Sequence, residues 1–201
     1  MCQARKRKGG RNLCKLQRPY HLSSLFASDR SIGSEKFPTP VADLCDANAS
    51  LILAGELRIL EPVFQPYGQC RSFSGRVVTM RVLEHNAGLR ALLETPGEGR
   101  VLVLDGGGSK RCALIGGTLA EVARGSGWAG AVVNGCVHDV DDVNGCAIGV
   151  RALASNPRKP GKSGATEMHV DVDVGGAVVR DGEWLYADSD GIIVCDREIN
   201  G

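Results

Sequence analysis

The chain has 201 residues, of which 43% are hydrophobic, 23% charged and only 4% aromatic. This composition supports a buried core, excludes disorder over the whole length, and argues against base stacking as a way to bind single-stranded nucleic acid. The net charge of +1 is unevenly distributed: residues 1–30 carry eight basic residues and one acidic residue, whereas the remainder carries 16 basic and 22 acidic residues.

We therefore assign residues 1–36 to a basic N-terminal tail and residues 37–201 to one domain. The tail has the composition of an organellar transit peptide, but its basic cluster at residues 5–8 equally fits a nuclear signal or an unstructured arm. It lacks the apolar segment of a secretory signal. We expect an intracellular protein, cytoplasmic or organellar, without a membrane partner, and no direct nucleic-acid contact from the acidic domain.

The first half of the domain begins with helix and turns to strand. Thr39 and Pro40 predict a helix start, with Thr39 as N-cap, and spaced apolar residues over 41–57 predict one or two helical stretches. Pro62 and Pro66 interrupt the chain. Residues 76–82 are rich in β-branched side chains and predict a strand, and residues 88–94 predict a short helix.

The centre of the domain predicts an α/β core. The apolar run 101–104 indicates a strand buried on both faces. Residues 112–115 form a second predicted strand, a helix starts at Thr118, and residues 131–133 form a third strand that ends at Asn134-Gly135. Strand–helix–strand order implies parallel pairing across a crossover.

The last third predicts an antiparallel β annex. Strands are expected at 148–150, 169–174, 177–179, 184–186 and 192–194, with a loop over 155–166 that contains two lysines. Asp181-Gly182 is a typical hairpin turn between two of these strands. The predicted fold class is therefore α/β with an antiparallel annex.

Two loops at the carboxyl ends of neighbouring strands form the candidate site. Gly116, Gly117, Thr118 and Leu119 stand where a strand passes into a helix, so their backbone amides and the helix dipole favour an anion. The loop 134–142 follows the next strand and carries His138, Asp139, Asp141 and Asp142. These carboxylates suit a hard divalent cation such as Mg²⁺ or Mn²⁺, although they equally suit the capping of a helix.

Other chemistry-bearing residues receive structural interpretations. The turn Asp105–Gly108 lacks the spacing and the following helix of a phosphate loop. The eight cysteines include no CxxC pair, so we expect reduced thiols, and Cys136 in the site loop is interpreted as a buried filler. His21, His85 and His169 are isolated, and we expect them on the surface or in loops.

At the site loops the sequence resembles the regulator of ribonuclease activity A family, whose aldolase-like members cleave 4-hydroxy-4-methyl-2-oxoglutarate and decarboxylate oxaloacetate. The resemblance runs from about Pro38 to Ile199. It is carried by residues 101–109, 116–120, 127–130, 134–141, 148–152 and 185–193.

The resemblance implies a swivelling β/β/α-type core, a ring-shaped homotrimer and a site between subunits that includes an acid from the neighbouring chain. It places the amides of Gly116, Gly117, Thr118 and Leu119 on the substrate carboxylate and the divalent cation on Asp139. His138 stands where the aldolases have an arginine that contacts the pyruvyl group, so we expect weaker binding of the small 2-keto acid or a different role as proton carrier.

The family's second branch offers a different function, a non-catalytic regulator that binds and inhibits a ribonuclease. In that branch the position of Asp139 is not an aspartate, so its presence here favours metal-dependent lyase chemistry. The absence of the arginine does not favour either branch, because the aldolases have it and the regulators often retain it. A diverged fold with another ligand is a third reading.

Overall fold

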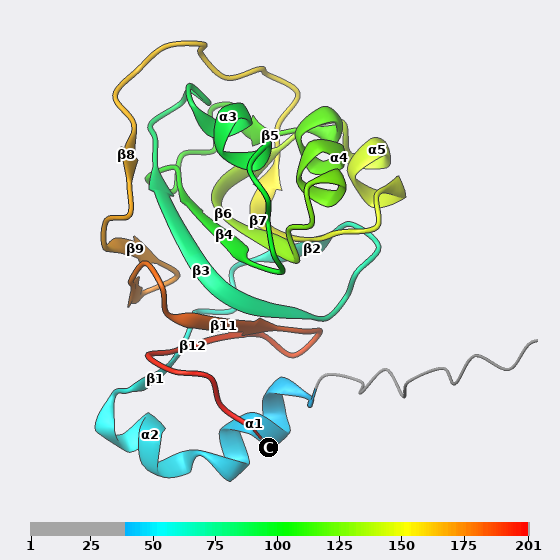
Figure 1. Ribbon diagram of the computed structural model, residues 1–201. Coiled ribbons are helices and arrows are strands. Elements are labelled where there is room, and N and C mark those ends of the chain that lie inside the picture. Colours follow the sequence, from blue (N-terminus) through cyan, green and yellow to red (C-terminus); the bar gives the residue numbers. More distant parts are fainter. Residues whose placement is uncertain (1–38, 201) are drawn as a thin grey trace, which may run out of the picture. The chain divides into compact units, whose positions relative to one another are not determined.

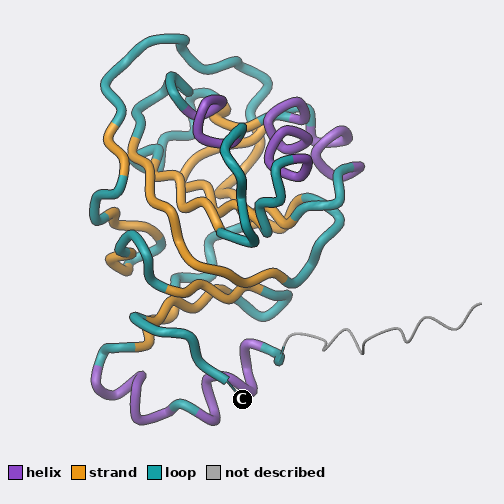
Figure 2. Tube along the Cα trace, in the orientation of Figure 1, coloured by secondary structure: helices purple, strands orange, loops and turns teal. Residues whose placement is uncertain are grey.

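A ten-stranded sheet organises residues 39–200, the part of the chain that the computed structural model describes (Figures 1 and 2). Its order is β1-β12-β11-β3-β4-β6-β7-β2, with β5 added to β6 and β8 added to β3. The strands of this sheet are β1 (Leu57–Ile59), β2 (Gln65–Tyr67), β3 (Phe73–Arg81), β4 (Val101–Asp105), β5 (Ala113–Ile115), β6 (Gly130–Val137), β7 (Gly149–Ser155), β8 (Glu167–Met168), β11 (Trp184–Ala187) and β12 (Ile192–Cys195). The remaining strands and the helices are β9 (Val172–Val174), β10 (Ala177–Val179), α1 (Val41–Ala47), α2 (Ala49–Ala54), α3 (Leu89–Leu93), α4 (Gly117–Gly125) and α5 (Val140–Gly145).

The centre of the sheet is parallel, as predicted. Strands β3, β4, β6 and β7 pair in parallel, and helices α3, α4 and α5 lie in the connections between them. Strand β4 is buried on both faces: Leu102 and Leu104 pack with the three helices, whereas Val101 and Val103 pack with β9 to β12. The layers are thus helices, parallel sheet and a second β layer, which confirms the predicted fold class (Figure 1).

The antiparallel annex is continuous with the core instead of forming a separate sheet. Strand β11 pairs antiparallel with both β3 and β12, and β1 pairs with β12 at the edge. The other edge is β2, which pairs antiparallel with β7 and contains Pro66. The edge position explains why Pro66 does not exclude a strand, since an edge strand can leave one side of its backbone unpaired.

The hairpin prediction at Asp181-Gly182 was wrong. Strand β10 pairs with β9 across a tight turn at Gly175-Gly176, where both glycines have positive φ (58° and 72°). Such a turn matches the twist of paired strands and favours glycine at both positions. The predicted strand 169–174 is also shorter than expected, because His169 has a φ of 57° and the pairing starts at Val172.

The first amide of helix α1 is bound by a side chain that is distant in sequence. The predicted cap is shifted, since Pro40 and not Thr39 occupies the N-cap position, and neither side chain caps the helix. The Val41 amide instead donates to Asp188 Oδ2 at 2.8 Å, from the turn between β11 and β12. Helices α1 and α2 then pack with β1, β12 and the C-terminal segment in a separate apolar cluster.

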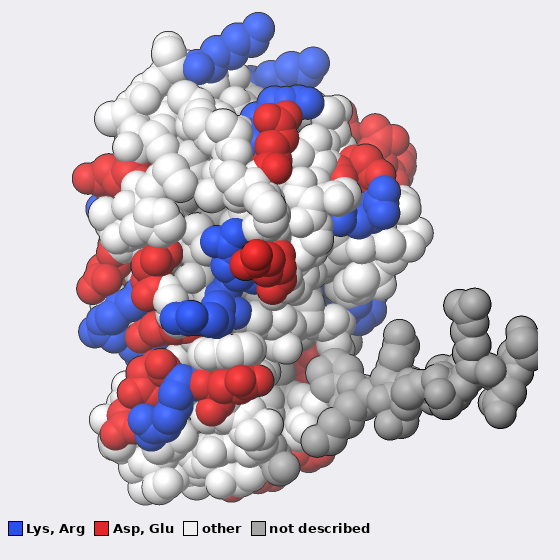
Figure 3. Space-filling model, in the orientation of Figure 1, with Lys and Arg blue, Asp and Glu red and all other residues white. Residues whose placement is uncertain are grey.

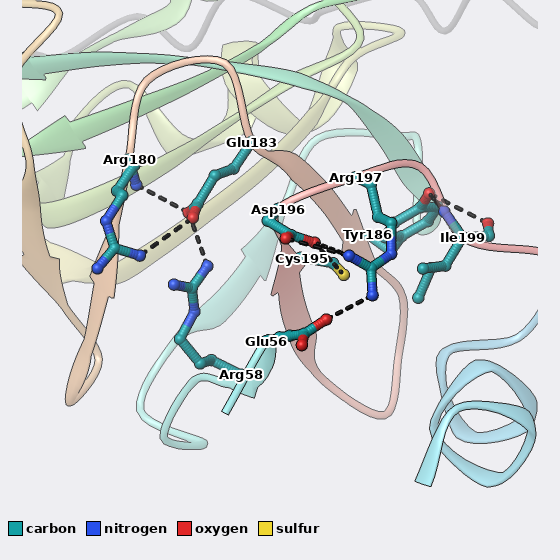
Figure 4. Close-up of polar contacts among 9 residues, drawn as sticks. All are labelled: Glu56, Arg58, Arg180, Glu183, Tyr186, Cys195, Asp196, Arg197 and Ile199. Atoms are coloured by element: carbon teal, nitrogen blue, oxygen red, sulfur yellow. Dashed lines mark hydrogen bonds and ion pairs between the residues drawn. The ribbon is translucent and has the colours of Figure 1, made fainter. Parts of the chain in front are cut away.

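Ion pairs reinforce this part of the molecule (Figure 4). Buried Glu183 lies 2.7 Å from Arg58 of β1 and 3.3 Å from Arg180. On the face shown in Figure 3, acidic and basic side chains are interspersed.

No helix among residues 39–200 combines the length and apolar character that a membrane crossing requires.

Candidate functional site

The two predicted site loops meet at the carboxyl ends of β5 and β6. The His138 amide donates to Ile115 O at 3.0 Å, which fixes the end of β6 beside the start of α4. The imidazole of His138 lies directly on Gly116, and Asp142 lies directly on Gly117. A methyl group at either glycine would collide with the facing side chain, so both positions need glycine for this contact.

The start of α4 leaves amide hydrogens free, although fewer than predicted. The amides of Leu119 and Ala120 both donate to Gly116 O at 3.0 Å. Among residues 39–200, no acceptor lies within hydrogen-bond reach of the amides of Gly117 and Thr118. These two are therefore the donors that the helix start, with its partial positive charge, offers to an anion.

Asp139 occupies a special backbone position. Strand β6 runs beyond the predicted end at Asn134-Gly135 to Val137, so the site loop is reduced to His138 and Asp139 before α5. Asp139 has left-handed backbone angles (φ 51°, ψ 51°) and stands at the N-cap of α5, but its side chain makes no capping bond. Its Oδ2 lies 2.7 Å from His138 Nδ1, and the Asp139 side chain is half exposed.

A close contact with Asp139 places a carboxylate beside the His138 ring. This contact is an ion pair by distance and is not aligned as a hydrogen bond, so it does not fix which ring nitrogen carries the hydrogen. Within the described residues Nε2 has no hydrogen-bond partner, and His138 is one of the side chains that line a pocket. His138 can thus take up a proton on the pocket side while Asp139 stabilises the resulting cation.

The pocket beside His138 has a volume of about 210 Å³. It is lined by Gly116, Thr118, Leu119 and His138, four of the predicted site residues, and also by Asn86, Lys159, Pro160 and Lys162. The two lysines belong to the loop between β7 and β8, which sequence reasoning recognised as a loop but did not bring to the site. Their charges and the open amides make the pocket suited to a small anion.

Not every predicted residue lines this pocket. Gly117 borders a neighbouring hollow together with Glu121, Asp141, Asp142 and Cys146, and Asp139 is joined to the pocket through His138. No cluster of three or more metal-ligating side chains occurs among residues 39–200. Asp139 therefore offers a single carboxylate, which suits an ion that keeps most of its waters, as Mg²⁺ does.

The cysteines near the site have thiols with raised pKa values. Cys136 is fully buried, as predicted, and burial raises the pKa of its thiol. Burial and a hydrogen bond to Glu121 raise the pKa of Cys146 to about 11. Arg124, together with this thiol, lowers the pKa of Glu121 to about 2, so the carboxylate stays charged and the thiol stays protonated.

A larger pocket of about 560 Å³ lies elsewhere, and none of the predicted site residues lines it. Its wall includes Arg151, whose hydrogen bonds go to backbone carbonyls and not to the loop 134–142. The buried guanidinium donates to Arg71 O at 2.6 Å and to Asp188 O at 2.9 Å, and it lies over the Phe73 ring. These carbonyl contacts give Arg151 a structural role between loops.

The Asp105 turn is likewise structural. Asp105 Oδ1 accepts from the Gly107 amide and from Asn134 Nδ2, both at 2.9 Å, and Oδ2 pairs with Arg81. These bonds occupy the groups that a phosphate loop would leave open for its ligand.

Gly116→Ala is expected to lower kcat/KM for a keto-acid substrate by about 100-fold, because the His138 ring would have to leave its position. Gly125→Ala in the same helix is the matched control, since a methyl group there meets no atom. Steady-state kinetics and thermal unfolding of both variants check the prediction. Equal activity of the two variants would contradict the importance of the contact between Gly116 and His138.

The fold and the site together define an α/β protein with a small-anion pocket at the carboxyl ends of parallel strands. The chain belongs to the RraA-like family, described as Aldolase/RraA, whose model matches residues 41–194. This family is the one that the motifs of the sequence predicted.

Individual relatives carry two kinds of names. A protein of Arabidopsis thaliana named 4-hydroxy-4-methyl-2-oxoglutarate aldolase 3 is 58% identical over 159 residues, which cover 79% of this chain and 96% of that protein. A protein of Burkholderia mallei with the same enzyme name is 53% identical over 154 residues, 77% of this chain and 93% of its own. The solved structure of the RNA-processing inhibitor RraA from Thermus thermophilis is 42% identical, with a TM-score of 0.75 over 82% of this chain and 97% of that chain.

Proposed function

We propose that this protein is a divalent-cation-dependent lyase that cleaves 4-hydroxy-4-methyl-2-oxoglutarate to two pyruvate molecules and decarboxylates oxaloacetate. The observation that carries the proposal is the convergence of His138, the open α4 amides and two lysines around one small pocket. The names of relatives that are 53% and 58% identical over nearly their whole length support the same reaction.

Both reactions break a carbon–carbon bond next to a 2-keto acid. In the retro-aldol reaction the 4-hydroxyl loses its proton, the bond between C3 and C4 breaks, and the C3 fragment leaves as the enolate of pyruvate. Oxaloacetate reaches the same enolate by losing carbon dioxide. In each case a proton then adds to C3, so one site that stabilises this enolate serves both substrates.

The residues of the pocket have separate parts in this proposal. The Thr118 amide, which borders the pocket, holds the substrate carboxylate at the positive end of α4, and Lys159 and Lys162 add fixed positive charge. His138 Nε2 takes the hydroxyl proton, and Asp139 stabilises the imidazolium that results. Asp139 Oδ1, which has no recorded partner among residues 39–200, is the atom that would hold the cation.

A bound Mg²⁺ or Mn²⁺ would act as a Lewis acid at the keto oxygen. One carboxylate suits such an ion, because Mg²⁺ usually keeps several waters and takes one or two protein carboxylates. A homotrimer would add ligands from a neighbouring subunit, in line with the family resemblance. A crystal grown with oxalate and Mn²⁺ tests this arrangement directly, since the ion is expected beside Asp139 and the oxalate beside Thr118.

Replacing His138 with arginine is expected to lower KM for oxaloacetate by about 10- to 100-fold, because a permanent charge adds a charged hydrogen bond. The rate constant kcat is expected to fall, since arginine cannot accept the hydroxyl proton. Steady-state kinetics with Mg²⁺ measure both values. Lys162→Gln is the companion variant.

If His138→Arg gains no affinity for oxaloacetate whereas Lys162→Gln loses affinity, the loop 156–166 with its two lysines (the lysine loop) already supplies the positive charge that binds the substrate. Our account of position 138 would then be wrong. His138→Gln, which has neither charge nor a basic nitrogen, separates the two roles of this side chain. It is expected to lose kcat with a smaller change in KM.

A second candidate function is a regulator that binds a ribonuclease. It is supported by the 42% identity to the Thermus RNA-processing inhibitor. The two proposals separate in one measurement: inhibition of a ribonuclease by this chain that persists in Asp139→Asn and without divalent cation would favour the regulator.

A further inference from the structure

His85 lies in the loop between β3 and α3, which our expectation of a surface or loop position includes, but its side chain is buried, and both of its ring nitrogens contact backbone. Nδ1 lies 3.2 Å from the Ala87 amide nitrogen, and Nε2 lies 2.9 Å from Ala165 O. An amide N–H can only donate and a carbonyl can only accept. The ring is therefore neutral, with its hydrogen on Nε2.

Ala165 belongs to the long loop between β7 and β8, which passes above α3 in Figure 1. The β3–α3 segment holds this loop at several points. Gly161 N donates to Glu84 O at 2.8 Å, Asn86 N donates to Gly161 O at 3.2 Å, and Thr166 Oγ1 donates to Ala87 O at 3.0 Å.

Gly164 of this loop lies directly on the His85 ring, so that a methyl group there would collide with it. The ring thus fills the space under the loop as well as bonding to it. Loss of the side chain would remove both the packing and the bond to Ala165.

The same loop carries Lys159 and Lys162 to the candidate pocket, and Asn86, next to His85, lines that pocket too. Apart from these anchors, residues 156–166 contain no helix or strand that could hold the lysines in place. On the near side the loop is held before Lys159, because Ala113 N donates to Arg158 O at 2.9 Å and Asn156 Nδ2 donates to Lys110 O at 2.7 Å. Beyond Pro160, the position of Lys162 depends on the attachment of the loop at its far side.

We propose that His85 is a positioning residue of this site: its neutral ring fastens the loop 156–166 to the β3–α3 segment and thereby keeps Lys162 at the pocket. The effect on keto-acid binding rests on the proposed function, whereas the fastening of the loop does not.

Several charged groups surround His85. Glu84 accepts from Ser109 Oγ and from Arg111, and these bonds hold the pKa of its carboxyl below the usual value; Arg158 also lies close enough to affect it. The loop itself brings Lys159 and Lys162.

A proton on Nδ1 would point at the Ala87 amide hydrogen, and donor would face donor. The ring would also gain a positive charge beneath a loop that already carries cations. Acid is therefore expected to loosen residues 158–166.

The test compares two substitutions of His85 with the wild type. Phenylalanine keeps the ring that packs on Gly164 but removes both hydrogen bonds, whereas the glutamine amide can still donate to Ala165 O and does not titrate. His169→Gln, at an exposed histidine that pairs with Asp181, is the matched control. Trypsin cleavage after Lys162 at about pH 8 and hydrogen exchange of residues 158–166 at about pH 8 and 5.5 report on the loop, and titration calorimetry with oxalate and Mg²⁺ reports on the pocket.

His85→Phe is expected to be cleaved about 10-fold faster than the wild type and to bind oxalate about 10-fold more weakly, while His85→Gln stays near the wild type in both. The wild type and His169→Gln are expected to lose exchange protection in the loop at the lower pH, and His85→Gln is expected to keep it. Should the phenylalanine variant unfold, the pH response of the glutamine variant decides alone.

Cleavage of His85→Phe at the wild-type rate, or a pH response of His85→Gln equal to that of the wild type, would overturn the fastening. A freed loop with unchanged oxalate affinity would overturn the positioning role. If oxalate fails to bind even the wild type, the proposed function fails, and the cleavage and exchange data still decide whether His85 fastens the loop.

Discussion

Replacing Asp139 with asparagine is expected to lower kcat/KM for oxaloacetate by about 1,000-fold, because the change removes both the charge that would hold the cation and the partner that stabilises protonated His138. Asparagine keeps the side-chain volume and tolerates left-handed backbone angles, which Asp139 adopts. The fold and the entry into α5 should therefore be preserved, so the loss reports on chemistry.

Titration with Mn²⁺, followed by electron paramagnetic resonance, separates the two effects. We expect the wild type to bind the ion and Asp139→Asn to bind it at least about 10-fold more weakly. Asp141→Asn, at an exposed position in the first turn of α5, is the control of equal charge. Equal Mn²⁺ affinity in wild type and Asp139→Asn would show that the cation binds elsewhere. If Asp139→Asn and Asp141→Asn lose the same Mn²⁺ affinity, the loss reflects the change in net charge and not a bond to Asp139.

Patterns that depend on neighbours in sequence predicted the core well. The uninterrupted apolar run at β4 can only be buried on both faces, and it proved to be the strand shared by two apolar clusters. The start of α4 and the end of β6 were placed together because the carboxyl ends of parallel strands share an edge of the sheet. His138 and Gly116 do meet there.

Features that depend on distant contacts were not predictable in the same way. Leu57, the first residue of β1, was expected in a helical stretch, and no strand was predicted at Arg58 and Ile59, because the pairing partner β12 lies more than a hundred residues away. The lysine loop gave no periodic signal, and its approach to the pocket depends on anchors such as His85. A single histidine in a loop-like context cannot reveal that its two ring nitrogens are bound to backbone.

The hairpin error shows how local turn signals compete. Asp181-Gly182 and Gly175-Gly176 are both typical turn sequences, and only tertiary pairing selects between them. The chain does turn at Asp181-Gly182, but the strands on either side of it do not pair with each other. Glu183, directly after this turn, is held by Arg58 and Arg180, and Val77 N donates to its carbonyl at 2.7 Å. This segment therefore serves as an anchor between β1 and β3 instead of a hairpin turn.

The importance of that anchor leads to a prediction about stability. Glu183→Ala is expected to lower the free energy of unfolding by about 3 kcal/mol, because it leaves the largely buried Arg58 guanidinium without a countercharge (Figure 4). Within the described part of the chain, Arg58 has no other partner that could compensate for the loss of Glu183. Its contact with Glu183, at 2.7 Å, is an ion pair by distance but is not aligned as a hydrogen bond. The Nε atom of Arg58 has no partner among the described residues. The Arg180 amide would lose its acceptor as well.

Thermal and urea unfolding measure this loss, with an expected fall in melting temperature of about 10 °C for a domain of this size. Glu56→Ala is the matched control, since Glu56 pairs with Arg197 at the surface and should change stability by less than about 1 kcal/mol. The double variant Arg58→Met, Glu183→Leu removes both charges together and is expected to recover most of the loss. If the single and the double variants are equally unstable, the packing of these side chains, and not the unpaired charge of Arg58, accounts for the effect.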